Sequence, residues 1–248
     1  MNFQAADTGS YTCFVTNVAG ADTSVPSSLG LNIPAVIASN PVSDTILVGG
    51  SVTFGVTATG TAPLSYKWLK NGTDSVGSSD TLVVSNAHLS DSGTYTCVVR
   101  NVAGSDTSDP AVLTVWMPST INANPVSRIA GVGDTVKFRV IASGTLPQTY
   151  KWLKNGIDSV GNSDTLTIAG LVEADSGAYM CIVTNIAGSD TSAPATLIVH
   201  LAATIDEQPV SRTVTAGQSV KFGVKATGQA PLSYKWLKNG TDSVGNSD

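Results

Sequence analysis

The heptapeptide YKWLKNG at residues 66–72 decides the fold, because it recurs along the chain at one fixed spacing. Its further copies lie at residues 150–156 and 234–240. The tryptophans at its third position are Trp68, Trp152 and Trp236, each separated from the next by 84 residues (152 − 68 = 84). A constant period of this length indicates tandem structural modules. The chain touches four copies of the repeat, of which two are whole.

Three of the four copies also carry the pattern D-x-G-x-Y-x-C, which obeys the same period. Its three occurrences are Asp7–Cys13, Asp91–Cys97 and Asp175–Cys181. Between the motifs, short alternating apolar runs separated by Gly, Pro, Asn and Asp predict strands and turns rather than helices. About seven strands in 84 residues is the density of a two-sheet sandwich, so the predicted fold class is all-β.

Single strands can be assigned within the second copy. SVTFGV (51–56) places alternate apolar residues on one face, and SYKWLK (65–70) does the same with Trp68. Asn71-Gly72 then predicts a tight hairpin turn, because both residues tolerate positive φ, so a partner strand should follow at once. A further strand pair is expected to close across a loop in which Gly104 adopts a left-handed conformation.

Composition excludes several classes of protein. Charged residues make up 12% of the 248, against roughly 25% in an average soluble protein. The net charge is −5, and the 13 Lys and Arg residues are scattered singly, so no basic stripe is available for nucleic acid. No apolar run reaches the roughly 18 residues that a membrane span needs. Neither nucleic acid nor a membrane span is therefore predicted.

These residues resemble the immunoglobulin fold, most nearly the intermediate-type domains found in tandem in cell-surface proteins. The resemblance covers the whole chain and rests on the D-x-G-x-Y-x-C motif and on the strand C tryptophan. It implies that each motif tyrosine hydrogen-bonds back to the turn before its strand. It also implies a common interior, to which the resemblance assigns Tyr11, Cys13, Val56, Trp68, Tyr95, Cys97, Val140, Trp152, Tyr179, Cys181, Val224 and Trp236.

The disulfide of that family is missing. Its first cysteine belongs on strand B, where this chain carries Val56, Val140 and Val224. The three cysteines are then expected in different cores, each facing a valine or a missing strand. In the chain-entropy model, a bridge from residue 56 to residue 97 would stabilise the domain by roughly 4 kcal/mol. Without that bridge, packing alone must stabilise the fold. Cysteine usage therefore does not indicate an oxidising compartment.

The 84-residue period divides the chain into four segments. Residues 1–34 would form the C-terminal part of one immunoglobulin-like domain (strands F and G), residues 35–116 and 117–200 two complete domains, and residues 201–248 the N-terminal part of another (strands A to C′). The joints have almost no linker, which predicts a semi-rigid rod. Two interpretations of the end segments stay open: a window cut from a longer repetitive protein, or head-to-tail association of copies through these partial domains.

Catalytic and metal chemistry find little support. The two histidines, His88 and His200, do not recur in the other copies, and solvent-exposed or packing roles are expected for them. Asp74, Asp80 and Asp242 could offer oxygen ligands to Ca²⁺, but their spacing is unlike an EF-hand, and a solvated loop is the preferred interpretation. No cofactor, no metal site and no enzymatic activity are predicted.

One further pattern concerns modification. Asn71-Gly72-Thr73 and Asn239-Gly240-Thr241 are formal N-glycosylation acceptors. The third copy reads Asn155-Gly156-Ile157, which keeps the turn residues and loses the acceptor. The shared requirement is therefore interpreted as hairpin geometry rather than sugar attachment.

The predicted function is that of a non-catalytic, extracellular or cell-surface array acting in adhesion or as a spacer stalk. Two alternatives remain: an accessory region of a secreted hydrolase, or a module that recognises a protein ligand. The low-charge, nearly uniform, disulfide-free repeats resemble bacterial surface arrays. A protein or glycan ligand is expected, and Tyr66, Lys67 and Lys70 could contact it.

Overall fold

In the computed structural model, which describes residues 4–246, the chain is built from strands and confirms the all-β prediction. Three short 3₁₀ turns are the exceptions among these residues: η1 (Ala5–Asp7), η2 (Leu89–Asp91) and η3 (Glu173–Asp175). No helix of the described part of the chain is long and apolar enough to cross a membrane. The chain divides into two compact units between Met117 and Pro118.

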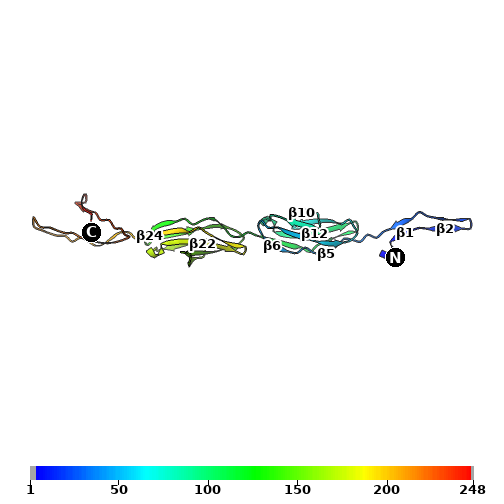
Figure 1. Cartoon of the computed structure of the whole chain (residues 1–248), viewed down its shortest axis with the longest axis horizontal. Coiled ribbons are helices and arrows are strands. Elements are labelled where there is room, and N and C mark those ends of the chain that lie inside the picture. Colours follow the sequence, from blue (N-terminus) through cyan, green and yellow to red (C-terminus); the bar gives the residue numbers. More distant parts are fainter. Residues whose placement is uncertain (1–3, 247–248) are drawn as a thin grey trace. The chain divides into compact units, whose positions relative to one another are not determined.

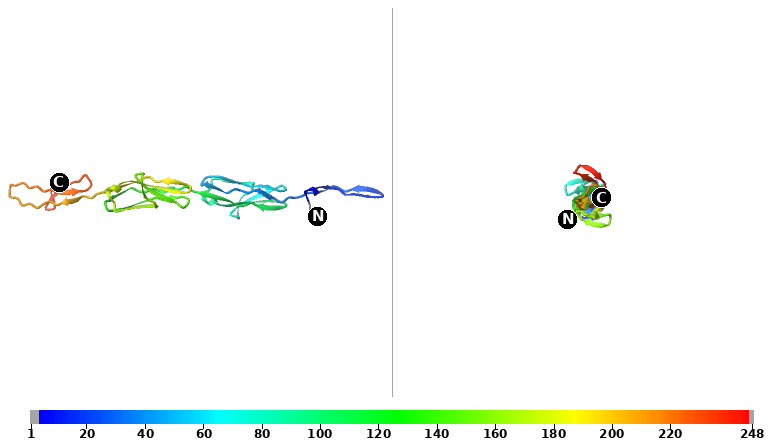
Figure 2. Two further views of the ribbon diagram at one scale, coloured as in Figure 1. Left: turned by 90° about the horizontal axis from the view of Figure 1, so that it is seen from below. Right: turned by 90° about the vertical axis from the view of Figure 1, so that its left-hand side faces the viewer.

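Residues 35–116 form a two-layer sandwich, called module 1 below (Figures 1 and 2). Its strands are β5 (Val36–Ser39), β6 (Asp44–Leu47), β7 (Val52–Gly55), β8 (Thr57–Thr59), β9 (Ser65–Lys70), β10 (Asp74–Gly77), β11 (Thr81–Val84), β12 (Gly93–Asn101), β13 (Gly104–Thr107) and β14 (Ala111–Trp116). One layer is a six-stranded sheet in the order β10-β9-β12-β14-β6, with β13 also paired to β12. The remaining strands pair as β7 with β11 and β5 with β8.

Residues 117–200 repeat this topology and are called module 2. Its strands are β15 (Thr120–Ala123), β16 (Arg128–Gly131), β17 (Thr135–Arg139), β18 (Ile141–Ser143), β19 (Thr149–Lys154), β20 (Asp158–Gly161), β21 (Thr165–Ala169), β22 (Gly177–Asn185), β23 (Gly188–Thr191) and β24 (Ala195–His200). The six-stranded sheet has the order β16-β24-β22-β19-β20, with β23 paired to β22.

The end segments hold fewer strands. The first contains β1 (Gly9–Tyr11), β2 (Phe14–Asn17), β3 (Gly20–Thr23) and β4 (Ser27–Leu29), and the last contains β25 (Thr204–Glu207), β26 (Lys225–Thr227), β27 (Trp236–Lys238) and β28 (Asp242–Gly245). Each pairs only within itself, as β1 with β4, β2 with β3, β25 with β26 and β27 with β28. We call residues 4–34 the first half-domain and residues 201–246 the last half-domain.

Module 1 has ten strands rather than the seven expected, because long strands are interrupted. Strand B breaks at Val56, whose N–H leaves the ladder and donates to the Asp80 carbonyl at 3.0 Å. The last strand begins earlier than the sequence suggested: β13 pairs with the end of β12 and β14 with its start. The interruption between them holds Ser108, whose hydroxyl accepts the Cys97 N–H at 2.9 Å.

The turns agree with the expected chemistry at one site and differ at another. Asn71 (φ 51°) and Gly72 (φ 81°) are both left-handed, and β10 follows directly, as predicted. The prediction of a left-handed Gly104 is wrong, because this residue is not among those with positive φ. Space favours glycine there instead, since a Cβ atom would lie 3.2 Å from the Cβ of Pro34, a tight contact.

Candidate functional site

The interior of each module brings together the valine, tryptophan and cysteine that the sequence assigned to it. In module 1, Cys97 lies opposite Trp68 in the β12–β9 register, and both are fully buried. Val56, at 5% exposure, belongs to the same apolar cluster. All three cysteines of the chain are free thiols. A small apolar contact therefore occupies the place that a disulfide takes in the family that the sequence resembles.

Module 2 reproduces this arrangement. Cys181 lies opposite Trp152 in the β22–β19 register, and both are fully buried in one cluster with Val140. Burial raises the pKa of the Cys97 thiol above its ordinary value and the pKa of Cys181 to about 11. Both thiols are thus protonated at neutral pH, which removes the thiolate that nucleophilic chemistry requires.

Aromatic stacking completes each core. The Phe54 ring stacks on Tyr95 with centroids 5.1 Å apart and lies 6.3 Å from the Trp68 ring. The indole N–H of Trp68 donates to the Ser79 carbonyl at 2.9 Å, so this buried polar atom has a partner. Phe138 makes the same contacts in module 2, at 5.1 Å and 6.3 Å.

The motif tyrosines hold the turn that precedes their strand. The Tyr95 hydroxyl donates to the Asp91 carbonyl at 2.8 Å, and Tyr179 donates to Asp175 at 2.7 Å. Burial, with the neighbouring Asp91 carboxylate, raises the pKa of Tyr95. The hydroxyl of Tyr11 donates to the Asp7 carbonyl at 2.5 Å. This bond is local, four residues along the chain, so it forms even where no complete sandwich surrounds it.

Four residues assigned to the interior do not lie in one. Tyr11 is 54% exposed, Cys13 is exposed, and Val224 and Trp236 are only half-buried. The reason is the missing opposite part of the sandwich, because each half-domain pairs its strands only within itself. The repeat pattern assigns these residues to interior positions of a module. It does not tell whether the strands that would bury them are present in the half-domains.

Asn101, a turn residue of module 1, hydrogen-bonds to the segment that contains Thr61 and to Ile33 at the end of the first half-domain. Asn101 is 8% exposed, and its side-chain amide donates to the carbonyls of Ile33 (2.8 Å) and Thr61 (2.9 Å). Its carbonyl oxygen accepts the N–H groups of Ala103 and Gly104, both at 3.0 Å. The recurrence of Asn at every 84th residue was the available signal for this role.

The residues suggested for ligand contact do not form one surface. Tyr66 is half-buried against the core of module 1. The ammonium group of Lys70 donates to the Ser90 carbonyl. Lys67 alone of the three is exposed, on the outer face of the six-stranded sheet opposite Val98.

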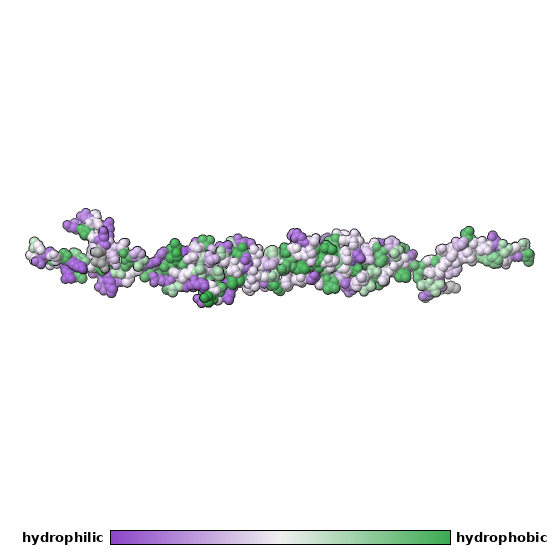
Figure 3. All heavy atoms as spheres, viewed as in Figure 1, coloured by the Kyte–Doolittle hydropathy of each residue, from purple (hydrophilic) through white to green (hydrophobic). Residues whose placement is uncertain are grey.

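The two modules differ on this outer face in both directions, since Leu47, Val112 and Trp116 of module 1 are replaced by Gly131, Thr196 and His200 in module 2. Four positions that hold Thr45, Thr96, Val98 and Thr114 in module 1 hold Ile129, Met180, Ile182 and Ile198 in module 2. Ile129 pairs with Ile198 across the β16–β24 ladder, and the two are 69% and 41% exposed. Apolar and polar residues are mixed over the surface seen in Figure 3. We call Ile129, Met180, Ile182 and Ile198 the apolar face of module 2.

The titratable groups do not converge on a reactive centre. His88 is exposed and lies 3.8 Å from the Asp91 carboxylate, and His200 is exposed on β24. Asp74, Asp80 and Asp242 are exposed, each on or beside a C′ strand or its loop. Within residues 4–246, no three His, Cys, Asp or Glu side chains lie close enough together to hold a metal ion.

With the fold and these surfaces established, comparison with known proteins assigns the family. A model of the immunoglobulin domain matches residues 34–101 and 118–185. The chain belongs to the immunoglobulin domain family. Both matches end at the asparagine that contacts the neighbouring segments, Asn101 in module 1 and Asn185 in module 2.

Individual relatives are animal proteins. Human Roundabout homolog 2 is 32% identical over 169 residues, which are 66% of this chain and 12% of that protein. Human hemicentin-1 is 30% identical over 265 residues, which cover 96% of this chain and 5% of that protein. The chain thus spans only a small part of these relatives. The predicted likeness to bacterial surface arrays is not supported, and the corrected comparison is with animal immunoglobulin repeats.

Among solved structures, the titin I-band fragment I67–I69 is similar to this immunoglobulin array. The TM-score is 0.64 at 25% identity, covering 87% of this chain and 82% of that fragment. The fragment's name denotes three successive domains of one protein. Its likeness to this chain supports tandem immunoglobulin sandwiches as the architecture.

Proposed function

We propose that this chain is part of an extracellular immunoglobulin array that binds a protein partner through the outer sheet face of module 2. The array would act in adhesion or recognition, and it would not be catalytic. We also propose the division into segments 1–34, 35–116, 117–200 and 201–248. The family assignment and the relatives, which are repeat proteins of the same kind, support this class of function.

The observation that carries the proposal is the exposed isoleucine pair Ile129 and Ile198 on the outer sheet face of module 2, at positions where module 1 has threonines. Most core positions are kept from module 1 to module 2, with exceptions such as Ala87 and Leu171, and the C–C′ turn is kept, with Asn71 and Asn155 both at φ 51°. Thr114 against Ile198 and Thr45 against Ile129 are changes on the outer face instead. Exposed apolar residues gathered on one face are typical of protein contact surfaces, whereas a pure spacer has no need for them.

The test replaces module 2 residues by those of module 1. In the full chain, Ile129→Thr with Ile198→Thr removes the apolar pair and leaves the core unchanged. We expect cells presenting the natural partner to adhere at least about tenfold less to a surface coated with this variant. The matched control is Thr45→Ile with Thr114→Ile in module 1, which should not reduce adhesion. Equal adhesion of the wild-type chain and the Thr variant would refute binding through this face.

A spacer is the second candidate, favoured by the near identity of the turns in the two modules. A spacer sets a distance, so its modules must be held in a fixed order with short joints. Small-angle scattering of the chain should then give a maximum dimension that does not change with ionic strength. If the maximum dimension decreases as ionic strength rises, as it would for freely jointed modules, the spacer function is wrong. That result would leave the proposal of partner binding standing.

A further inference from the structure

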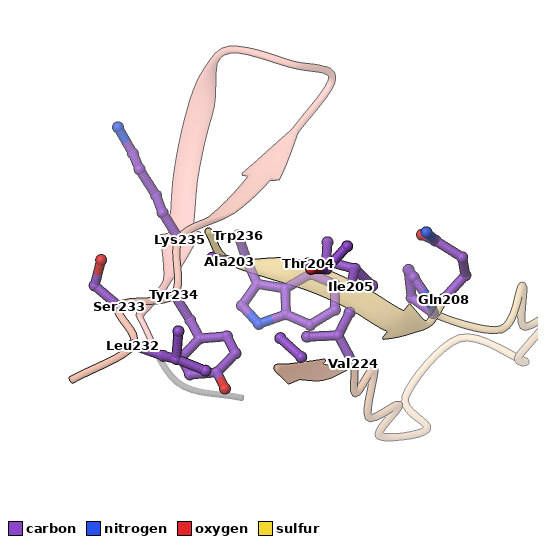
Figure 4. Close-up of a pocket in the computed structure, with 12 residues that line it drawn as sticks. Ala203, Thr204, Ile205, Gln208, Val224, Leu232, Ser233, Tyr234, Lys235 and Trp236 are labelled. Carbon is purple, nitrogen blue, oxygen red and sulfur yellow. The ribbon is translucent and has the colours of Figure 1, made fainter. Parts of the chain in front are cut away.

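The apolar groove of the last half-domain belongs to the interior of a module. Its lining includes Val224, Tyr234 and Trp236, whose side chains are directed into the same space in Figure 4. The residues 168 positions earlier, two repeat lengths, lie in or against the core of module 1. This groove therefore consists of packing residues and is not a separate ligand site.

A different cleft, of about 520 Å³, lies wholly on module 2 and is lined by charged side chains. Its lining consists of three cations, one carboxylate and two smaller side chains, namely Arg128, Lys137, Arg139, Asp164, Val126 and Thr165. We call these six residues the basic cleft. All three cations are exposed, so a ligand from solution can reach them.

The strand arrangement explains why these cations meet. Lys137 and Arg139 are alternate residues of β17, so both point to the outer side of its layer, while Phe138 between them is buried. Arg128 begins β16, the edge strand of the six-stranded sheet. A tight turn joins β16 to β17, because the Asp134 N–H donates to the Gly131 carbonyl at 3.2 Å. The basic cleft thus lies along one side of the sandwich, where the two layers meet.

The charges of the basic cleft are not balanced. The Asp164 carboxylate lies 3.7 Å from the Arg139 guanidinium, so this one cation has an acidic neighbour. Among residues 4–246, Arg128 and Lys137 form no ion pair. Charges of one sign that share a concave surface reinforce each other's potential and attract ions of the opposite sign. The basic cleft is therefore suited to an anionic ligand.

The fold itself does not require these cations. The equivalent positions of module 1 hold Asp44, Thr53 and Gly55, and Asp80 stands at the place of Asp164. The same surface of module 1 is therefore acidic, although both modules have the same topology.

Two of the three cations recur further along the chain. Arg212 and Lys221 lie 84 residues after Arg128 and Lys137, and Gly223 stands at the third position. A cationic pair that appears in two repeats is suited to a ligand that carries negative charge along its length.

We propose that the basic cleft of module 2 binds a sulfated polysaccharide. The cations are exposed rather than enclosed, which suits many fixed sulfates on one chain better than a single small anion. The guanidinium groups of Arg128 and Arg139 present planar sets of N–H donors that match the oxygens of such groups. Val126, 64% exposed, offers an apolar contact to the carbon face of a sugar ring. The basic cleft contains no residue of the apolar face, so this site goes beyond the proposed function.

Binding to immobilised heparin in about 0.05 M NaCl, where screening is weak, tests the site. All full-length chains compared carry Arg212→Ser with Lys221→Thr, so that module 2 holds the only copy of the pair. Arg128→Ser with Lys137→Thr should then weaken binding about thirtyfold, which is about fivefold for each cation. No binding by the reference chain, or no weakening by this variant, overturns the proposal.

The matched control removes the same charge elsewhere. Lys67→Thr with Lys151→Thr changes two lysines that are exposed and lie outside the basic cleft. Its affinity for heparin should stay within about threefold of the reference chain, because charges away from the ligand are screened. Equal weakening by the control variant would show general attraction of a polyanion and overturn the site.

A charge-conserving variant separates loss of charge from loss of folding. Arg128→Lys with Lys137→Arg keeps both cations and should bind heparin within about threefold of the reference chain. If it binds as weakly as the neutral variant, the positive charge of these positions is not what binds heparin, and the proposal is wrong.

Two further probes identify the ligand chemistry. Heparin from which the sulfates have been removed, and poly-glutamate, should each bind at least about tenfold more weakly than heparin, because they carry carboxylates alone. Equal binding of poly-glutamate would indicate an acidic protein segment instead and overturn the proposal. Ile129→Thr with Ile198→Thr should leave heparin binding unchanged, so failure of this site and failure of the proposed function can be told apart.

Discussion

Removing the side-chain amide of Asn101 should destabilise module 1 selectively. The variant Asn101→Ala loses two donated bonds, to the carbonyls of Ile33 and Thr61, and two accepted bonds in the turn. The first two cost about 1 kcal/mol each, because the carbonyls lose a buried partner. The N–H groups of Ala103 and Gly104 can hydrogen-bond to water instead, so the loss of each of these two bonds costs about half as much. The expected loss is about 3 kcal/mol, which corresponds to about a hundredfold change in the opening equilibrium.

Hydrogen exchange measured by mass spectrometry resolves this effect by module. The slowest amides of β12 in the full-length variant should exchange about 100 times faster, because their exchange reports the opening of module 1. Those of β22 in module 2 serve as an internal reference and should not change. Asn17→Ala is the matched control, since among residues 4–246 Asn17 accepts bonds only from Ala19 and Gly20 in its own turn. A change in β12 below about threefold, or an equal acceleration in β22, would refute the reasoning.

Three further predictions concern the core. Val56→Cys should form a bridge to Cys97 and stabilise module 1 by about 3 kcal/mol in denaturant titrations, from roughly 4 kcal/mol of loop entropy less about 1 kcal/mol of lost packing; a gain that persists in reductant would contradict it. Tyr95→Phe should cost about 1 kcal/mol, because the Asp91 carbonyl loses its hydroxyl partner, and a neutral result would show that this bond does not matter. The pKa of Cys181 is raised to about 11 in the folded protein. Above pH of about 9 the thiol ionises in the unfolded chain but not in the folded one, so the free energy of unfolding is highest below the unfolded thiol's pKa and falls by about 3 kcal/mol between pH of about 9 and about 11. Cys181→Ala should remove that part of the alkaline decline.

The features that sequence predicts best are those fixed by period and local pattern. The 84-residue repeat and the D-x-G-x-Y-x-C motif were enough to place Trp68 beside Cys97 in a sandwich interior. The Asn71-Gly72 turn followed from backbone sterics alone. These properties depend on residues close in sequence or on a repeated register, so no knowledge of tertiary contacts was needed.

Other features depend on contacts that a repeat pattern does not encode. Gly104 is favoured by the close approach of Pro34, which comes from a distant segment, and not by its own dihedral angles. The exposure of Trp236 follows from which strands lie beside it. The exposed isoleucine pair on module 2 does not follow from the repeat, because Ile198 is a position at which the copies differ.

Counting reactive thiols tests the central claim that apolar packing replaces the disulfide in each intact module. A thiol reagent in dilute native buffer should label one cysteine at once, identified by peptide mapping as Cys13, which is exposed. Cys97 and Cys181 are buried and protonated, so they should react only when denaturant is added, giving three thiols without reductant. Immediate labelling of Cys97 or Cys181 in native buffer, or fewer than three thiols after denaturation, would contradict the account.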